Sequence, residues 1–169
     1  YMKAGGYGIV TLHRPANVDD AQQLATIVDA LCTAQSLLPL VFPVHPRTRQ
    51  RLAAAHLDER LAQAGVLLLE PLSYKPFMSL LKDARLAITD SGGLQEETTY
   101  LGIPCLTMRE NTERPITISE GTNRLTSPAG LLADIRTSLG NDAPRPVRPQ
   151  YWDGATAGRC VDDLRARRG

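Results

Sequence analysis

The chain alternates short apolar runs with amphipathic stretches along most of its length, and this alternation limits the possible folds more than any other feature. Most of the apolar runs are followed by a stretch with helical periodicity, as parallel strands joined by crossover helices require. The pattern predicts an α/β fold, with a doubly wound parallel sheet and Rossmann-like, right-handed connections. Strands are expected over residues 7–12, 40–44, 66–69, 86–89, 104–107 and 122–126.

Helix signals occupy the intervals between these strands. Asp19 and Asp20 can cap the first helix, and Gly102 suits the end of a later one. Pro43 weakens the second strand, because proline cannot donate a ladder hydrogen bond. One continuous helix is expected over residues 47–64. The expected inner faces of the first two helices are Leu24, Ile27, Val28 and Leu31, and then Leu52, Ala55 and Leu61. The other helices are expected over 73–81, 92–101, 131–139 and 156–168, the last after a stiff connector with Pro144, Pro146 and Pro149.

The bulk properties exclude several classes of function. The 169 residues suffice for one compact domain, and a formal net charge of +1 gives no long-range attraction to nucleic acid or to a membrane. No apolar run reaches the roughly 18 residues of a membrane span. The cysteines (Cys32, Cys105 and Cys160) have no metal-ligand spacing, which favours a reduced, cytoplasmic chain without a metal or cofactor.

Polar and turn-forming residues follow four of the expected strands. The segments are His13 to Asn17, His45 to Arg47, Glu70 to Leu72 and Asp90 to Gly93. Carboxyl ends of parallel strands meet at one edge of the sheet, where ligands of such folds bind. The sequence therefore predicts a site at this edge.

The segment Asp90-Ser91-Gly92-Gly93 is the most informative of these ends. Glycine lets the backbone approach a bulky anion, and the free N–H groups of a first helical turn point at it. Ser91 can add a hydroxyl donor. A plain tight turn with a serine N-cap has the same sequence, so the segment alone leaves both interpretations open.

Charged residues near these ends are candidate ligand contacts. Glu97 can accept both hydroxyls of a ribose, although a solvated helix carboxylate is the simpler alternative. His13 can donate to a phosphate or move a proton, and the adjacent Arg14 offers a fork of donors that suits phosphate. The mixed-charge loop from Arg109 to Pro115 is either exposed or part of the site. His56 lies among alanines and receives no role.

Other candidate residues and familiar motifs give weaker evidence about function. Tyr74, Phe77 and Tyr100 can stack on a base, but aromatic residues at helical spacing are more often core. No dinucleotide-binding glycine fingerprint follows a strand, and no phosphate-binding lysine loop is present.

In combination, the segments resemble the non-hydrolysing UDP-N-acetylglucosamine 2-epimerases of bacteria. The likeness runs in order through nearly the whole chain, and the DSGG-x-QEE and TERP motifs are specific together. The matching segments are VTLHRPANVDD (10–20), VFPVHPRTRQRL (41–52), EPLSYKPFMSLL (70–81), TDSGGLQEETTYLGIPCLTMRENTERP (89–115), EGTNRL (120–125) and WDGATAGRCVDDL (152–164).

The resemblance implies one half of a two-domain fold of the glycosyltransferase B type. This chain is then the C-terminal, UDP-binding domain over residues 1–169, and the family's N-terminal domain is absent. The implied reaction interconverts UDP-N-acetylglucosamine and UDP-N-acetylmannosamine by elimination and re-addition of UDP. The resemblance also implies a homodimer at full length and a place in cell-surface polysaccharide synthesis.

The resemblance assigns roles by position. Catalysis falls to His13, which faces the leaving phosphate, and Glu97 holds the ribose. His45 lies at the domain interface, near the regulatory pocket of some members, and the loop Glu70-Pro71-Leu72 lies near the uracil. The remaining implied UDP contacts are Arg14, Phe77, Ser91, Gly92, Gly93 and Arg114.

Two departures from the family pattern qualify these roles. Pro15-Ala16 replaces the Arg-Glu of many members, so allosteric regulation is not expected. The family's proton-moving carboxylates lie on the other domain, so we expect this chain alone to be inactive. A glycosyltransferase of the same fold, a non-catalytic UDP-binding module and a hydrolysing epimerase remain alternatives.

Overall fold

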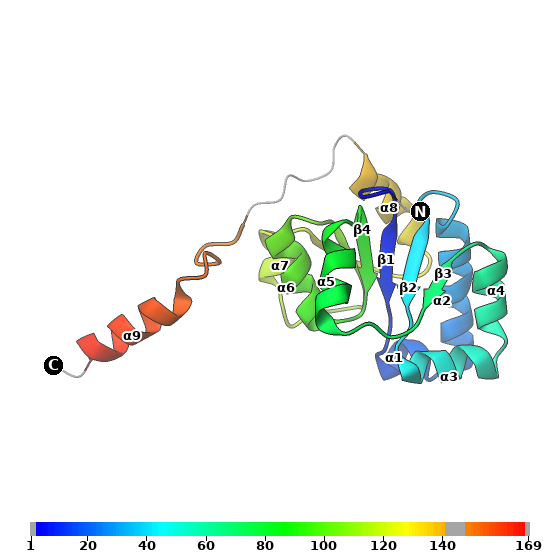
Figure 1. The fold of residues 1–169 in the computed structure, drawn as a ribbon, viewed down its shortest axis with the longest axis horizontal. Coiled ribbons are helices and arrows are strands. Elements are labelled where there is room, and N and C mark those ends of the chain that lie inside the picture. The colour runs from blue at the N-terminus through cyan, green and yellow to red at the C-terminus, as the bar shows by residue number, and fades with distance from the viewer. Residues whose placement is uncertain (1–2, 141–147, 168–169) are drawn as a thin grey trace.

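A parallel sheet of six strands forms the centre of the computed structural model, which describes residues 3–140 and 148–167 (Figure 1). The strand order is β3-β2-β1-β4-β5-β6, and each neighbouring pair is parallel. The doubly wound, Rossmann-like prediction is confirmed, and the order reverses between β1 and β4. The strands are β1 (Gly8–Thr11), β2 (Leu40–Pro43), β3 (Leu67–Leu69), β4 (Leu86–Thr89), β5 (Cys105–Met108) and β6 (Asn123–Thr126).

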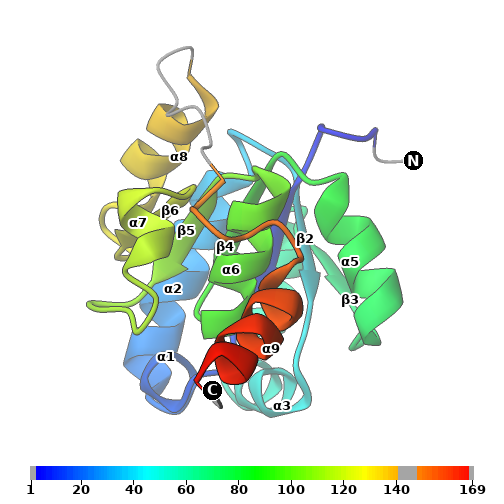
Figure 2. The same ribbon diagram turned by 90° about the vertical axis from the view of Figure 1, so that its left-hand side faces the viewer.

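Helices cover both faces of this sheet (Figures 1 and 2). Val10 and Ile9 show the alternation, because Val10 packs in the core beneath α2 and α8 while Ile9 packs in the core beneath α5 and α6. The helices are α1 (Pro15–Val18), α2 (Ala21–Ala34), α3 (Pro46–Ala54), α4 (Leu57–Gln63), α5 (Tyr74–Lys82), α6 (Gly92–Leu101), α7 (Ile116–Ser119), α8 (Leu131–Leu139) and α9 (Thr156–Ala166).

Local sequence signals explain most of the element boundaries. The Asp20 carboxylate accepts a hydrogen bond from the Gln23 amide at 2.7 Å and so caps α2. Gly102 ends α6 with a φ of 72°, a left-handed conformation that glycine adopts without strain. Pro43 is the last residue of β2, so its missing N–H falls at the end of the strand and not within it.

The prediction of one helix over residues 47–64 is wrong. The chain breaks at His56, whose φ of 54° is left-handed, so α3 and α4 form instead. The break turns Leu57 and Leu61 toward the core, where α4 contacts α2, and it leaves Ala55 exposed. The two four-residue helices α1 and α7 were also not expected, because each is too short for a periodic signal.

The C-terminal helix α9 agrees with its predicted range within two residues, and none of its residues is buried. Figure 1 shows it apart from the two helical layers. Of the predicted connector, Pro149 is described, whereas Pro144 and Pro146 lie outside the described residues. None of the described helices has the length and apolar run needed to cross a bilayer.

Candidate functional site

The carboxyl ends of β1 and β4 are neighbours at the point where the strand order reverses, and a pocket of about 310 Å³ opens there. Apolar walls surround a few polar groups, as is usual for small-molecule sites. The pocket brings six of the predicted site residues together. Its lining is Thr11, Leu12, His13, Pro43, His45, Pro71, Leu72, Tyr74, Phe77, Ser91, Gly93, Leu94 and Glu97.

His13 is held at this pocket by Asp90, the first residue after β4. His13 Nδ1 lies 3.2 Å from an Asp90 carboxylate oxygen, and the His13 side chain is 42% exposed whereas Asp90 is fully buried. Asp90 also accepts hydrogen bonds from the His13 and Arg14 amides and from the Asn17 side chain. The imidazole is therefore fixed through Nδ1, which leaves Nε2 for a ligand.

The pair shifts the pKa of both partners. The hydrogen bond to Asp90 raises the pKa of His13 and outweighs both partial burial and the nearby Arg14 charge, which lower it. For Asp90, burial raises the pKa, but the hydrogen bonds from His13, Arg14 and Asn17 together lower it further. The arrangement favours a protonated His13 next to an ionised Asp90, which is the state a general acid needs.

The first turn of α6 forms another wall of the pocket. Ser91 is the N-cap residue in extended conformation, and within the described residues no side chain caps this helix. The first N–H groups of a helix have no partner inside the helix, and the helix dipole makes this end favourable for an anion. Thus the Gly93 amide and the Ser91 hydroxyl lie where the sequence predicted an anion site, whereas the Ser91 amide donates to Thr89 Oγ1 at 3.0 Å.

Gly92 and one of the two predicted arginines, Arg14, lie beside a carboxylate that was not predicted, that of Glu113. Arg14 Nη2 lies 3.0 Å from Glu113 Oε1, and a Cβ on Gly92 would lie 2.8 Å from the same oxygen. Arg114 instead pairs through Nε with Glu96 of α6, at 3.1 Å. Gly92, Arg14 and Arg114 therefore lie beside the pocket rather than in its lining.

The opposite side of the pocket is aromatic. Phe77 and Tyr74 come from the first turn of α5, after Pro71 and Leu72 of the preceding loop. The carboxylate of Glu97 raises the pKa of the Tyr74 hydroxyl. Tyr100, also considered for stacking, lies under the Arg148 guanidinium at 4.5 Å and does not line the pocket.

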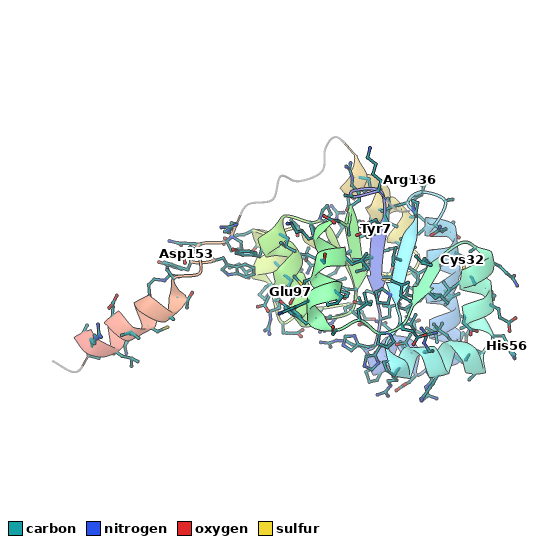
Figure 3. The ribbon with its side chains drawn as sticks, in the orientation of Figure 1. Tyr7, Cys32, His56, Glu97, Arg136 and Asp153 are labelled. Carbon is teal, nitrogen blue, oxygen red and sulfur yellow. The ribbon has the colours of Figure 1, made fainter. Side chains whose placement is uncertain are left out.

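His45 lies in the same pocket as His13, with 5.7 Å between the ring centroids. It is the N-cap residue of α3, and its Nδ1 accepts the Arg47 amide at 3.2 Å. Its regulatory role stays a prediction. His56, in contrast, lies at the outer corner between α3 and α4 (Figure 3).

A buried amide joins the α6 turn to the loop after β5. Gln95, which is fully buried, accepts hydrogen bonds from Thr112 at 2.5 Å and from Asn123 at 3.0 Å, and it donates to the Ser91 carbonyl at 3.2 Å. Such a satisfied network fixes one geometry. Sequence reasoning missed Gln95, as it missed the roles of Asp90 and Glu113, because no spacing rule connects these positions.

Comparison with known proteins shows the family to which the chain belongs. A family model described as UDP-N-acetylglucosamine 2-epimerase matches residues 2–165. The chain belongs to this family. A UDP-N-acetylglucosamine 2-epimerase of Methanocaldococcus jannaschii is 41% identical over 122 residues, which are 70% of this chain and 33% of that protein. A Pseudomonas aeruginosa UDP-2,3-diacetamido-2,3-dideoxy-D-glucuronate 2-epimerase is 40% identical over 80% of this chain and 38% of its own length.

Solved structures of the family share the fold. The Methanocaldococcus jannaschii UDP-N-acetylglucosamine 2-epimerase in complex with UDP-N-acetylglucosamine and UDP superimposes with a TM-score of 0.82 at 34% identity. That match covers 95% of this chain and 45% of the other. The chain thus spans less than half the length of the family members that it resembles.

Proposed function

We propose that this chain is the UDP-binding domain of an epimerase that interconverts UDP-N-acetylglucosamine and UDP-N-acetylmannosamine. The observation that carries the proposal is that buried Asp90 holds His13 in the same pocket as the uncapped amino end of α6. A proton donor beside an anion-binding helix end suits a reaction in which a diphosphate departs and returns. The Methanocaldococcus jannaschii relative with UDP-N-acetylglucosamine and UDP supports the choice of ligand.

The pocket suits UDP in one orientation. The diphosphate lies at the first turn of α6, where Ser91, Gly92 and Gly93 supply backbone and hydroxyl donors. Glu97, one turn further along α6, accepts the ribose hydroxyls, and Phe77 contacts the uracil. Arg14 and Arg114, from the surrounding loops, add positive charge near the diphosphate. The sugar then extends away from this domain.

The proposed chemistry needs one acid from this chain. A base removes the proton from C2, the bond between C1 and the phosphate oxygen breaks, and a C1=C2 double bond forms. The electron pair of the broken bond goes to the phosphate oxygen, which protonated His13 stabilises by donating its proton. On return, His13 takes the proton back as UDP adds to C1, and a proton enters C2 from the opposite face. Nothing is oxidised or reduced.

The base and the dry sugar pocket are proposed to come from a second domain. The solved relatives are about twice as long as this chain, which leaves room for such a domain. We further propose a homodimer at full length that works in the cytoplasm, where its free cysteines stay reduced, and supplies cell-surface polysaccharide synthesis.

The test is to titrate the chain with UDP by calorimetry and to follow C2 inversion of UDP-N-acetylglucosamine by NMR. We expect UDP binding without inversion by the chain alone, and inversion by the full-length protein. Robust inversion by the chain alone contradicts the proposed division between domains. Sugar transfer to an acceptor identifies a glycosyltransferase instead, and release of free N-acetylmannosamine identifies a hydrolysing epimerase.

The same assay run with UDP-2,3-diacetamido-2,3-dideoxy-D-glucuronate addresses a second substrate. The Pseudomonas aeruginosa relative that is named for this sugar is nearly as similar to the chain as the UDP-N-acetylglucosamine 2-epimerase of Methanocaldococcus jannaschii. The pocket described above recognises the UDP part that both substrates share. Faster inversion of the diacetamido sugar by the full-length protein would change the proposed substrate and leave the proposed mechanism intact.

A further inference from the structure

The carboxylate of Glu113 occupies a position that suits a phosphate. Arg14 Nη2 lies 3.0 Å from one carboxylate oxygen, and Arg109 Nη2 lies 2.7 Å from the other. A Cβ on Gly92 would approach this carboxylate to 2.8 Å, so the group lies against the first turn of α6. The hydrogen bond from Arg109 is the main cause that lowers the Glu113 pKa to about 2. The protein therefore holds an internal anion beside its uncapped helix end.

This anion and a diphosphate compete for the same partners. Two guanidinium groups and the positive end of a helix attract either group, and two anions at this distance from each other repel. A diphosphate has more charge than one carboxylate and presents more acceptor oxygens to the arginines. The diphosphate therefore displaces the carboxylate when it binds.

The structure lets the Glu113 side chain leave without moving its loop. Thr112, the preceding residue, is hydrogen-bonded to buried Gln95 and accepts the Arg114 amide at 3.0 Å. These bonds fix the backbone on both sides of Glu113. The Glu113 side chain itself is 44% exposed, so a change of rotamer can swing it into solvent.

We propose that Glu113 is a displaceable internal anion, which neutralises Arg14 and Arg109 in the ligand-free protein and gives both arginines to the diphosphate on binding. The inference rests on the proposed function, because it needs a diphosphate ligand at α6. The inference predicts the direction in which the UDP affinity changes when the carboxylate is removed. Glu113 lies in the site, yet its carboxylate opposes binding, so its removal strengthens the affinity for UDP.

The experiment compares UDP and uridine binding by calorimetry in the wild-type chain and in three variants. Glu113→Gln removes the charge, and Glu113→Asp retracts it. Glu110→Gln is the matched control, because it removes the same charge from the same loop at an exposed residue without an ion pair among the described residues. We expect Glu113→Gln to bind UDP about three- to tenfold tighter, since exposed ion pairs are individually weak. Glu113→Asp should give a smaller gain.

The controls distinguish failure of this inference from failure of the proposed function. Glu110→Gln should stay within about twofold of wild type for UDP, and uridine affinity should be unchanged in every variant, because uridine has no phosphate. If the wild type binds UDP and Glu113→Gln binds it equally well or more weakly, the inference is wrong and the proposed function is not contradicted. A wild-type chain that does not bind UDP overturns both.

Discussion

The two ends of the central sheet differ in a way that supports the proposed position of the site. The amino ends of the strands border a hollow of about 1030 Å³, whereas the pocket at the carboxyl ends measures about 310 Å³. The larger hollow is lined largely by glycines and apolar residues. Its charged residues are Arg85, Glu120 and Arg124, and Arg124 is paired with Asp134 at 3.3 Å. The smaller pocket holds His13 with its buried carboxylate. Volume alone would favour the amino ends, whereas the proposed site lies at the carboxyl ends.

Helix polarity supplies the physical reason. At the large hollow, α6 and α8 end, and both Gly102 and Leu139 line it. Helix carboxyl ends carry partial negative charge, which repels a diphosphate. At the small pocket, α6 begins, and α3 begins after His45. The helix ends of one sheet thus favour an anion at its carboxyl edge and disfavour one at its amino edge, and the following predictions test this contrast.

The largest effect is expected for the acid at the carboxyl end. In the full-length protein, His13→Asn should lower turnover roughly 10²-fold or more, the usual loss when a general acid or base is removed. The matched control is His56→Asn, at the outer corner between α3 and α4, which should leave turnover unchanged. The measurement is the rate of C2 inversion by NMR. A His13→Asn protein of normal stability and near-wild-type turnover removes His13 from the mechanism.

The next largest effect concerns the stability of the protein and comes from a glycine near the amino ends of the strands. A Cβ on Gly121 would lie 2.5 Å from both the Thr117 carbonyl oxygen and the Thr99 hydroxyl, and a backbone atom cannot move aside cheaply. Gly121→Ala should therefore destabilise the chain by about 1–3 kcal/mol in urea unfolding, the usual cost of overpacking. Its UDP affinity per folded molecule should be unchanged. A clear loss of UDP affinity without loss of stability contradicts the division between the two ends.

Much of the fold was predictable because periodicity reports burial directly. The apolar runs located all six strands, and the end of α6 followed from Gly102. The break at His56 was not predictable, because Ala54 and Ala55 suit a continuous helix and the turn is set by packing of Leu57 on the other side of the break. At this position, tertiary contacts outweigh the local helix propensity of the alanines.

The location of the candidate site could be predicted from the sequence, whereas the contacts between its residues were harder to predict. The strand-end rule placed His13, Ser91 and Glu97 in one pocket, although they are up to 84 positions apart (97 − 13). The bond between His13 and Asp90 joins two strands that are neighbours only after folding. A carboxylate directly after the apolar run of β4 was the available signal, since a buried charge needs a partner.

A smaller effect is expected for close approach at the α6 turn. Gly92 does not need a left-handed conformation, so its small size serves approach rather than backbone strain. Gly92→Leu should weaken UDP binding about tenfold, or ~1.4 kcal/mol, because the side chain enters the space beside Glu113 where the diphosphate is proposed to bind. Gly158→Leu on α9 is the control, since a Cβ there meets nothing within 4 Å. Equal UDP affinities for the two variants contradict the proposed position of the diphosphate.

The smallest effect is the pH dependence that the His13–Asp90 pair gives to stability. The pKa of His13 is raised in the folded chain, so its contribution is fully present below the unfolded value of about 6.5 and is lost as pH rises through the folded pKa. The pKa of Asp90 is lowered, so its contribution is present above about 3.9 and is lost as pH falls through the folded pKa. Because His13 is 42% exposed, solvent screening keeps its share below about 1 kcal/mol.

The measurement is urea unfolding of wild type, His13→Asn and Asp90→Asn at pH 5.5 and pH 9, with ~0.3 kcal/mol precision needed. The difference in free energy of unfolding between wild type and His13→Asn should be larger at pH 5.5 than at pH 9. The Asp90→Asn variant should lack the same pH-dependent contribution to its stability. An advantage that grows toward pH 9 would mean that His13 is held neutral, and the acid at the carboxyl end of the sheet would have to be sought elsewhere.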